Sequence, residues 1–390
     1  MQGAIDALAS PSERHADRDK PNAYPPSVGR VIAIIPAHNE AETVHLSLLA
    51  LSAQTRVPDE VFVVADNCTD ATASRARDYG AKVIVTEGNS DKKAGALNQV
   101  LADLLSPLGS LGSLGEDDVV LVQDADSFLD PGFVEGGLRA LAQRPRLGAV
   151  GGTFRGQPAP PGASRREQFL AHLQDNEYAR YARDVRRLRG KCLVVTGTAA
   201  MFRAATLTRI STARHDGTLP AGDGRGGVYD TSVLTEDNEL SFAMMTLGYT
   251  LLAPAEMTLT TEVMPTWRQL WQQRLRWKRG AVENCFQYGF TAVTRRYWGR
   301  QALTAAGVVV TLLYLATLIW ALPHGGLSIQ PFWLGVSGVF VMERFVTLRD
   351  KGWRHQIAAA SMYELPYELF LQATHAKAYV DALFRRQRKW

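Results

Sequence analysis

The feature that most restricts the fold of this chain is an alternation of short apolar runs with amphipathic segments in its first third. Val31–Ile35, Glu60–Ala65 and Lys82–Thr86 are rich in β-branched residues, and a fourth apolar run begins at Val119. Strands that alternate with helices predict a doubly wound α/β fold with a mostly parallel sheet. The helices expected between the strands are Ala41–Gln54, Asp70–Tyr79 and Ala94–Leu105.

The fourth apolar run ends in two carboxylates two positions apart. Residues 119–128 read VVLVQDADSF, so Asp124 and Asp126 follow a strand that is apolar on both faces. Ligands of open α/β sheets bind beyond the carboxyl ends of the strands, and a hard divalent cation would offset the repulsion between these two charges. An Asx-type turn that caps a helix starting near Pro131 explains the same residues. This stretch alone leaves both interpretations open.

Composition excludes some classes of function. The chain has 390 residues, enough for one large domain with an appendage or for two domains. Its net charge of +4 is mild and no basic array is interleaved with aromatic residues, so nucleic-acid binding is not indicated. Cys68, Cys192 and Cys285 match no metal-binding spacing and indicate a reducing compartment. Residues 1–30 lack the apolar core of a signal peptide and predict a flexible arm.

A long apolar stretch near the C-terminus predicts attachment to a lipid bilayer. Ala302–Leu322 is uncharged over about 20 residues, the length that crosses a membrane; a buried core helix is the alternative. Lysines and arginines precede it, which places that side in the cytoplasm by the positive-inside rule. We therefore expect a multi-pass protein of the cell membrane whose N-terminal domain is cytoplasmic.

The segments after this stretch predict one more span and one interfacial helix. Residues 332–348 are apolar except for Glu343 and Arg344, which should face protein or the membrane interface because lipid disfavours charge. Residues 356–384 carry four charges and predict a helix that lies on the inner membrane face. Two spans cannot enclose a polysaccharide channel within one chain, so we expect a homo-oligomer or a product that one chain does not export unaided.

Six motifs follow one another along the chain. They are PAHNE at 36–40, ADNCTDAT at 65–72, KKAGALN at 92–98, DAD at 124–126, TED at 235–237 and QRLRW at 273–277. In this order they resemble family 2 glycosyltransferases, especially the membrane-embedded branch that includes cellulose, chitin and hyaluronan synthases. The resemblance implies a GT-A type catalytic domain over residues 31–265, an amphipathic interface segment over 266–300 that carries QxxRW, and a membrane region over 301–390.

The resemblance implies a nucleotide site at the strand ends. Asp66 would accept a hydrogen bond from a uracil imide, and Pro36, His38 and Glu40 would line the base and ribose. Lys93 resembles the family lysine near the donor phosphates, where lysine acts as a point charge; Lys92 before it replaces a glycine that is common in relatives. Turn formation by Asp66 and an exposed helix start at Lys93 are the alternative interpretations.

The resemblance also assigns the carboxylates of the DAD and TED motifs. Asp126 would bind a divalent cation, Mn²⁺ or Mg²⁺, with Asp124 beside it facing the sugar or ribose. Asp237 would be the general base that deprotonates the acceptor hydroxyl, and Glu236 would orient the site. One base without a nucleophilic carboxylate implies inversion at the anomeric carbon. A helix cap at the TED motif is the alternative.

Two segments resemble the acceptor side of such enzymes. Gly197 and Thr198 lie in VVTGTAAMFR, which resembles the floor of the acceptor pocket. Gln273 and Trp277 of QRLRW can share a helix face and would contact the acceptor sugar, while Arg276 would contact the diphosphate. A belt of tryptophan and arginine beside a membrane would give the same composition.

The motifs together predict a membrane-anchored, metal-dependent, inverting glycosyltransferase. It would move a sugar from a nucleotide donor, most simply a UDP-sugar, to a growing glycan, with QxxRW favouring repeated addition by resemblance only. A single-addition transferase that acts on a lipid or polyprenyl phosphate is one alternative. A nucleotidyltransferase that forms sugar nucleotides is another, although it would need neither TED nor QxxRW. A third is a catalytically inactive membrane binding or scaffold protein on a transferase fold.

Overall fold

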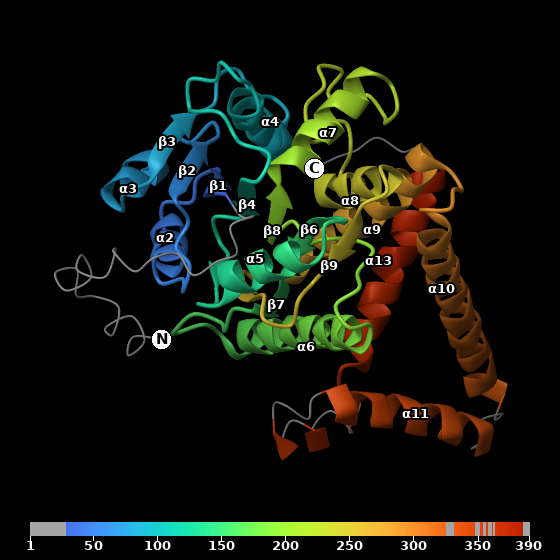
Figure 1. Cartoon of the computed structure of the whole chain (residues 1–390). Helices are drawn as coiled ribbons and strands as arrows, with labels where there is room; N and C mark the ends of the chain where they lie inside the picture. Colours follow the sequence, from blue (N-terminus) through green and yellow to red (C-terminus); the bar gives the residue numbers. More distant parts are fainter. Residues whose placement is uncertain are drawn as a thin grey trace.

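A seven-stranded sheet with the order β3-β2-β1-β4-β8-β6-β9 forms the centre of the molecule (Figure 1). It is seen in a computed structural model that describes residues 29–324, 331–347, 352–353, 356–357, 361 and 363–384, so the expected N-terminal arm lies almost wholly outside the described residues. The strands are β1 (Val31–Ala37), β2 (Glu60–Ala65), β3 (Lys82–Val85), β4 (Val119–Gln123), β6 (Leu147–Gly151), β8 (Ala199–Arg203) and β9 (Thr250–Leu252).

The predicted α/β fold with a mostly parallel sheet is confirmed. β1 pairs in parallel with both β2 and β4, and β2 pairs in parallel with β3. β8 runs antiparallel to its neighbours β4 and β6, and β6 pairs in parallel with β9. The carboxyl ends of the first four strands therefore meet at one edge, and the amino end of β8 lies at the same edge.

Helices cover both faces of this sheet, as expected for a doubly wound fold. Alternate residues of β1 enter opposite cores: Ile32 and Ile34 face one layer, and Val31 and Ile35 face the other. Because each face is buried, the strand reads as a continuous apolar run. One layer holds α4 (Lys92–Leu104), α7 (Ala204–His215) and α8 (Glu236–Thr246), and the other holds α2 (Val44–Ser52), α3 (Thr72–Asp78) and α5 (Phe133–Gln143).

A second, smaller sheet has the strand order β5-β10-β7. A long helix, α6 (Arg165–Arg187), packs against it, and Phe154 contacts Tyr178 of α6 with their ring centroids 4.6 Å apart. α6 begins with a capping box, in which Ser164 and Glu167 each accept the other's backbone N–H. The strands are β5 (Phe128–Leu129), β7 (Thr153–Gly156) and β10 (Thr258–Thr261).

The C-terminal third of the chain is helical. α13 (Leu365–Leu383) packs along α9 (Trp267–Tyr288), and Tyr367 and Leu371 of α13 share an apolar cluster with Leu270 of α9. α10 (Arg295–Ala321) ends in the short η2 (Leu322–His324) and extends away from the sheet (Figure 1). α11 (Pro331–Thr347) then lies across the far ends of α10 and α13 (Figure 1).

Among the described residues, one helix is long and apolar enough to cross a membrane. It runs over Arg295–His324 and includes the stretch expected from the sequence. Only 6% of its most apolar part is buried. The expectation of two spans is not supported. α11 has only 17 residues, which gives a length of about 26 Å at 1.5 Å per residue, less than a bilayer core of about 30 Å.

Two charged residues near the end of α11 pair with charged residues elsewhere in the chain. Glu343 forms an ion pair with Arg183 of α6 at 2.5 Å. Arg344 is buried and contacts Glu364 at 3.1 Å and Glu368 at 2.9 Å. These contacts hold the end of α11 against charged groups of α6 and of the segment around the start of α13.

Candidate active site

The carboxyl ends of β1 and β2 bring predicted donor residues together. Nδ1 of His38 donates a hydrogen bond to the backbone oxygen of Asp66 at 2.6 Å. The turns that follow the two strands are tight, because Asn39 and Asn67 have φ angles of 57° and 48°. Asparagine tolerates this left-handed region better than most residues do. Short polar loops therefore follow both strands at the same edge of the sheet.

The carboxylate of Asp66 is fixed by Asn67 of its own motif and by two residues that the sequence did not single out. Its Oδ1 accepts hydrogen bonds from Thr86 at 2.8 Å, from the Asn89 amide at 2.8 Å and from the Asn67 amide at 3.0 Å. Thr86 and Asn89 follow β3, so the ends of two neighbouring strands hold this side chain. Its contact with a nucleotide base stays a prediction.

Pro36 and Glu40 differ in their surroundings. Pro36 is buried within β1. Glu40 accepts a hydrogen bond from Thr43, and burial raises the pKa of Glu40, with the charges of Asp124 and Asp70 adding to the rise. Glu40 is thus close enough to the DAD motif to share its negative potential.

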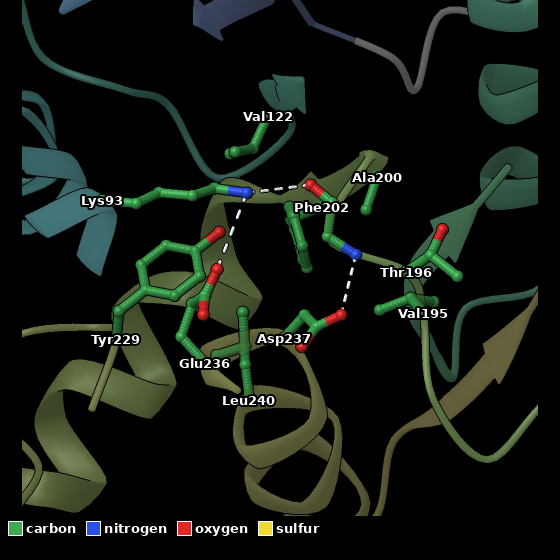
Figure 2. A pocket seen from close by; sticks show the side chains of 11 residues that line it. Lys93, Val122, Val195, Thr196, Ala200, Phe202, Tyr229, Glu236, Asp237 and Leu240 are labelled. Carbon is green, nitrogen blue, oxygen red and sulfur yellow. Dashed lines mark hydrogen bonds and ion pairs between the residues drawn. The ribbon is translucent and has the colours of Figure 1, made fainter. Parts of the chain in front are cut away.

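Lys93 joins three of the predicted motifs, and Figure 2 shows its contact with Glu236. Its Nζ lies 2.5 Å from Oδ1 of Asp124, 2.9 Å from the backbone oxygen of Gly197 and 3.6 Å from Oε1 of Glu236. Lys93 belongs to the first turn of α4 and is not an exposed helix-start residue. Lys92 before it has a φ of 54°, a value that glycine adopts freely, which accounts for the glycine expected from the resemblance.

Asp237 lies in the first turn of α8, and two backbone N–H groups hold its carboxylate. Its Oδ2 accepts from Gly197 at 2.9 Å, and its Oδ1 accepts from Asn238 at 2.7 Å. Burial raises the pKa of Asp237 to about 6, and the charge of Glu236 adds to the rise. Thr235 occupies the N-cap position but makes no capping side-chain hydrogen bond, so helix capping by Thr235 does not explain the TED motif.

The DAD motif follows β4 without capping a helix. α5 begins at Phe133, and its N-cap is Gly132, which excludes the Asx cap considered from the sequence. Ser127 donates to Asp126 at 3.2 Å. Burial, together with the charges of Asp124, Glu262 and Glu40, raises the pKa of Asp126 to about 7. Within the described ranges, no group of three or more histidine, cysteine or acidic side chains is arranged to hold a metal ion.

α9 places the QRLRW motif next to the TED segment. Nδ2 of Asn284 donates to the backbone oxygen of Thr235 at 3.1 Å and to Oδ1 of Asn238 at 3.0 Å. Gly280 lies against the same segment, since a Cβ there would be 2.5 Å from Oγ1 of Thr235. Arg276 is exposed on α9, and its charge slightly lowers the pKa of Asp124, which burial raises overall.

The remaining residues of QRLRW surround a buried arginine. The guanidinium of Arg274 lies 4.4 Å from the ring centroid of Trp277 and forms an ion pair with Glu177 at 2.9 Å. Gln273 accepts a hydrogen bond from Arg274. Thr198, on the predicted acceptor floor, is 3.1 Å from Thr196 through their hydroxyl oxygens. Acceptor contacts of Gln273, Trp277 and Thr198 stay predictions.

A small cavity of about 10 Å³ lies among these groups. Lys93, Glu236 and Asp237 line its polar side, together with the ring of Tyr229 (Figure 2). The sequence did not single out Tyr229. Asn98 of the KKAGALN motif holds it from α4, since the Asn98 amide donates to the Tyr229 backbone oxygen and accepts from its N–H, each at 2.8 Å.

Comparisons with known proteins agree with this geometry. Residues 32–210 match the family described as glycosyl transferase family 2. The chain is 23% identical over 314 residues to the poly-beta-1,6-N-acetyl-D-glucosamine synthase of Staphylococcus aureus (strain COL), which covers 77% of this chain and 68% of that protein. It is 28% identical over 261 residues to the probable glycosyltransferase YdaM of Bacillus subtilis (strain 168), covering 64% of this chain and 55% of that protein.

A solved structure shares the fold. It is the mannosyltransferase PcManGT from Pyrobaculum calidifontis in complex with GDP-Man and Mn²⁺. The TM-score is 0.57 at 20% sequence identity, and the superposition covers 95% of this chain and 92% of that one. The similarity therefore includes the C-terminal helices as well as the sheet.

Proposed function

This chain carries a family 2 glycosyltransferase domain over residues 32–210, as the motifs predicted, and on that premise we propose that it is a membrane-anchored, metal-dependent, inverting transferase. It moves a sugar from a UDP-sugar donor to a growing glycan by repeated addition. The observation that carries this proposal is the joint placement of Asp237, Glu236 and Lys93 around one cavity at the carboxyl edge of the sheet, with Asp124 paired to Lys93.

Asp237 is the proposed general base. Two backbone N–H groups fix its carboxylate, so it does not depend on a mobile side chain for its direction. A pKa of about 6 leaves most of the carboxylate ionised at pH 7 while keeping it more basic than an exposed aspartate. As the acceptor hydroxyl attacks the sugar carbon, Asp237 takes its proton, and the bond to the diphosphate breaks on the opposite face.

Lys93 is the proposed contact for the donor phosphates. Without a donor, its ammonium group is neutralised by Asp124 and Glu236. A diphosphate at the strand edge would add negative charge beside this ammonium, which acts as a point charge. Arg276 on α9 adds a second positive charge whose field reaches Asp124.

The residues of the DAD motif fit a divalent cation, Mn²⁺ or Mg²⁺. The raised pKa of Asp126 reflects burial beside Asp124, Glu262 and Glu40, so this part of the site carries an excess of negative groups. Asp124 is already paired with Lys93, and Asp126 is therefore the first ligand that we propose, with Asp124 second. Few protein carboxylates suffice where substrate phosphates complete the coordination. When bound, the cation supplies Lewis-acid stabilisation of the departing diphosphate.

The choice of donor and acceptor rests on different observations. The hydrogen bonds to Asp66 from Thr86 and Asn89 end on Oδ1, so Oδ2 can accept from a base imide, which supports a uracil nucleotide. The similar structure from Pyrobaculum calidifontis holds GDP-Man instead. The Staphylococcus aureus relative is by name a polysaccharide synthase, which supports repeated addition. α10 supports attachment of the enzyme to a membrane.

Product length tests the proposal. Purified full-length protein in lipid nanodiscs is incubated with Mn²⁺ or Mg²⁺, one sugar nucleotide at a time and a short glycan primer, and products are sized by mass spectrometry. We expect a ladder with one UDP-sugar and no product in EDTA. A single product that never extends in excess donor would contradict repeated addition and favour a lipid-phosphate acceptor. Full activity in EDTA would contradict the metal assignment.

A further inference from the structure

A second cavity, of about 660 Å³, lies between α5 and α6. None of its lining residues lines the candidate active site. Figure 1 shows α5 and α6 on either side of β7, which contributes to the floor. A volume of this size falls in the range of about 300–1,000 Å³ that is typical of small-molecule sites.

The surfaces of both helices that face the cavity carry small residues. Gly136 and Ala140 face it from α5, and Ala179 and Ala182 face it from α6. These pairs are spaced by four and three residues, so each pair lies on one helix face. The floor is apolar and includes Phe154 of β7 and Leu252 at the end of β9.

The rim of the cavity is positively charged. Five of its lining residues are arginines and two are acidic. Two of the arginines are already neutralised, since Arg139 contacts Glu135 at 2.8 Å and Arg155 contacts Asp130 at 2.9 Å. Arg144 and Arg189 form no ion pair with any residue in the described ranges. The cavity therefore combines an apolar floor with uncompensated guanidinium groups.

We propose that this cavity binds a small organic phosphate. Arginine suits phosphate because its planar fork donates two parallel hydrogen bonds, and Arg144 and Arg189 have their charges available. The apolar floor would cover a hydrocarbon or aromatic body that an inorganic ion lacks. This chemistry occurs in soluble phosphoesters and in phospholipid headgroups.

Binding by the purified full chain tests the proposal without any transfer reaction. Phenyl phosphate, a short-chain phosphatidylglycerol and inorganic phosphate are titrated separately by calorimetry, in EDTA so that no phosphate binds through a cation at the strand edge. We expect at least one of the two organic phosphates to bind about tenfold more tightly than inorganic phosphate, since burial of the body adds at least about 1.4 kcal/mol. Which one binds identifies the source.

Two variants and a matched control locate the binding. The double variant Arg144→Gln with Arg189→Gln should raise the Kd of the organic phosphate about tenfold or more, since it removes two charge-assisted contacts. Ala179→Leu should weaken binding of the organic phosphate by filling part of the cavity from α6. The control changes Arg165 and Arg166, exposed at the other end of α6, to glutamine and should leave binding unchanged. Equal affinity for all three phosphates, or binding that the cavity variants do not alter, would overturn the proposal.

Discussion

At the scale of single residues, the direction of the Asp237 carboxylate is set by backbone. Both of its oxygens accept backbone N–H groups, from Gly197 and Asn238. Gly197 also approaches closely, since a Cβ at that position would lie 3.3 Å from Oδ2 of Asp237. Any side chain at position 197 would therefore crowd the proposed base, which explains a glycine in this part of the VVTGT segment.

Replacing the proposed base should separate catalysis from binding. Asp237→Asn keeps the size of the side chain but cannot take a proton, so we expect turnover to fall by at least about 10². Binding of UDP, measured by calorimetry with Mn²⁺, should stay nearly unchanged, because a base acts in the transition state. The matched control is Asp78→Asn on the exposed end of α3. A variant that keeps more than about a tenth of the activity would exclude Asp237 as the base.

The pKa of Asp237 also predicts a pH dependence. Because the carboxylate must be ionised to accept a proton, kcat/KM should fall as the pH drops below about 6, the pKa of this group. Burial is the largest cause of the raised pKa and the charge of Glu236 is the second, so Glu236→Gln should move this acidic limb to lower pH. Profiles are recorded at saturating Mn²⁺. A limb that stays in place in Glu236→Gln would contradict the assignment to Asp237.

The residues that sequence reasoning found are those within short motifs. Lys93, Asp124 and Asp237 each stand in a recognisable local pattern, and all three lie around the candidate site. Tyr229 and Asn284 carry no such pattern. Each acts through contacts with residues more than 40 positions away, with Asn98 and Thr235 as their partners, so only the folded chain reveals them.

At the scale of elements, the contact between α8 and α9 decides whether the TED and QRLRW motifs meet. Asn284 of α9 is fully buried and donates to the Thr235 backbone and to Asn238. Gly280 lets the two elements approach, because its missing side chain leaves room for Thr235. The position of QRLRW relative to TED is thus set by packing around one glycine and one asparagine.

Gly280→Ala tests this contact, because the packing argument predicts that it lowers the free energy of unfolding. A Cβ at position 280 would lie 2.5 Å from Oγ1 and 2.7 Å from Cγ2 of Thr235, so we expect a loss of about 1–3 kcal/mol in the free energy of unfolding and reduced transfer. Gly299→Ala in α10 is the control, since no atom lies within 4 Å of its Cβ, and it should gain about 0.4–1 kcal/mol. Thermal unfolding in detergent measures both. Stabilisation by Gly280→Ala would contradict the packing argument.

The sequence predicted which segments are strands or helices better than it predicted the direction of a strand in the sheet or the contacts between elements. The first four strands follow from apolar runs whose ends coincide with polar motifs, and all four occur within about a residue or two of the expected ranges. The antiparallel direction of β8 was not predictable, because a buried strand reads alike in both directions. Hydropathy predicted the apolar part of α10. It could not predict that Arg344 of α11 forms ion pairs with Glu364 and Glu368.

At the scale of the whole molecule, the C-terminal helices leave the sheet and return to it. α10 extends outward, whereas Arg344 at the end of α11 contacts Glu364 and Glu368, and α13 packs on α9 (Figure 1). Glu343 near the end of α11 pairs with Arg183 of α6, so the chain after α10 returns to the side of the sheet. We propose that α10 enters the membrane from the side of the sheet, while α11 does not span it and α13 lies on the same side as the sheet.

Cysteine accessibility in sealed vesicles tests this topology. In a background without the three native cysteines, Asp78→Cys and Leu383→Cys should react with an impermeant reagent from the cytoplasmic face. His324→Cys, at the end of the apolar helix, should not react from that face. Labelling of all three positions from the cytoplasmic face would show that α10 does not enter the membrane.

The central claim is that this chain transfers sugar from a nucleotide with Asp237 as its base, and nucleotide release coupled to product stereochemistry measures it most directly. Purified full-length protein receives a panel of sugar nucleotides with Mn²⁺, and released nucleotide and the anomeric configuration of the product are followed together by NMR. We predict release with one donor, a product of inverted configuration, and loss of both signals in Asp237→Asn and in EDTA. Retained configuration, or release that persists at the wild-type rate in Asp237→Asn, would contradict the account.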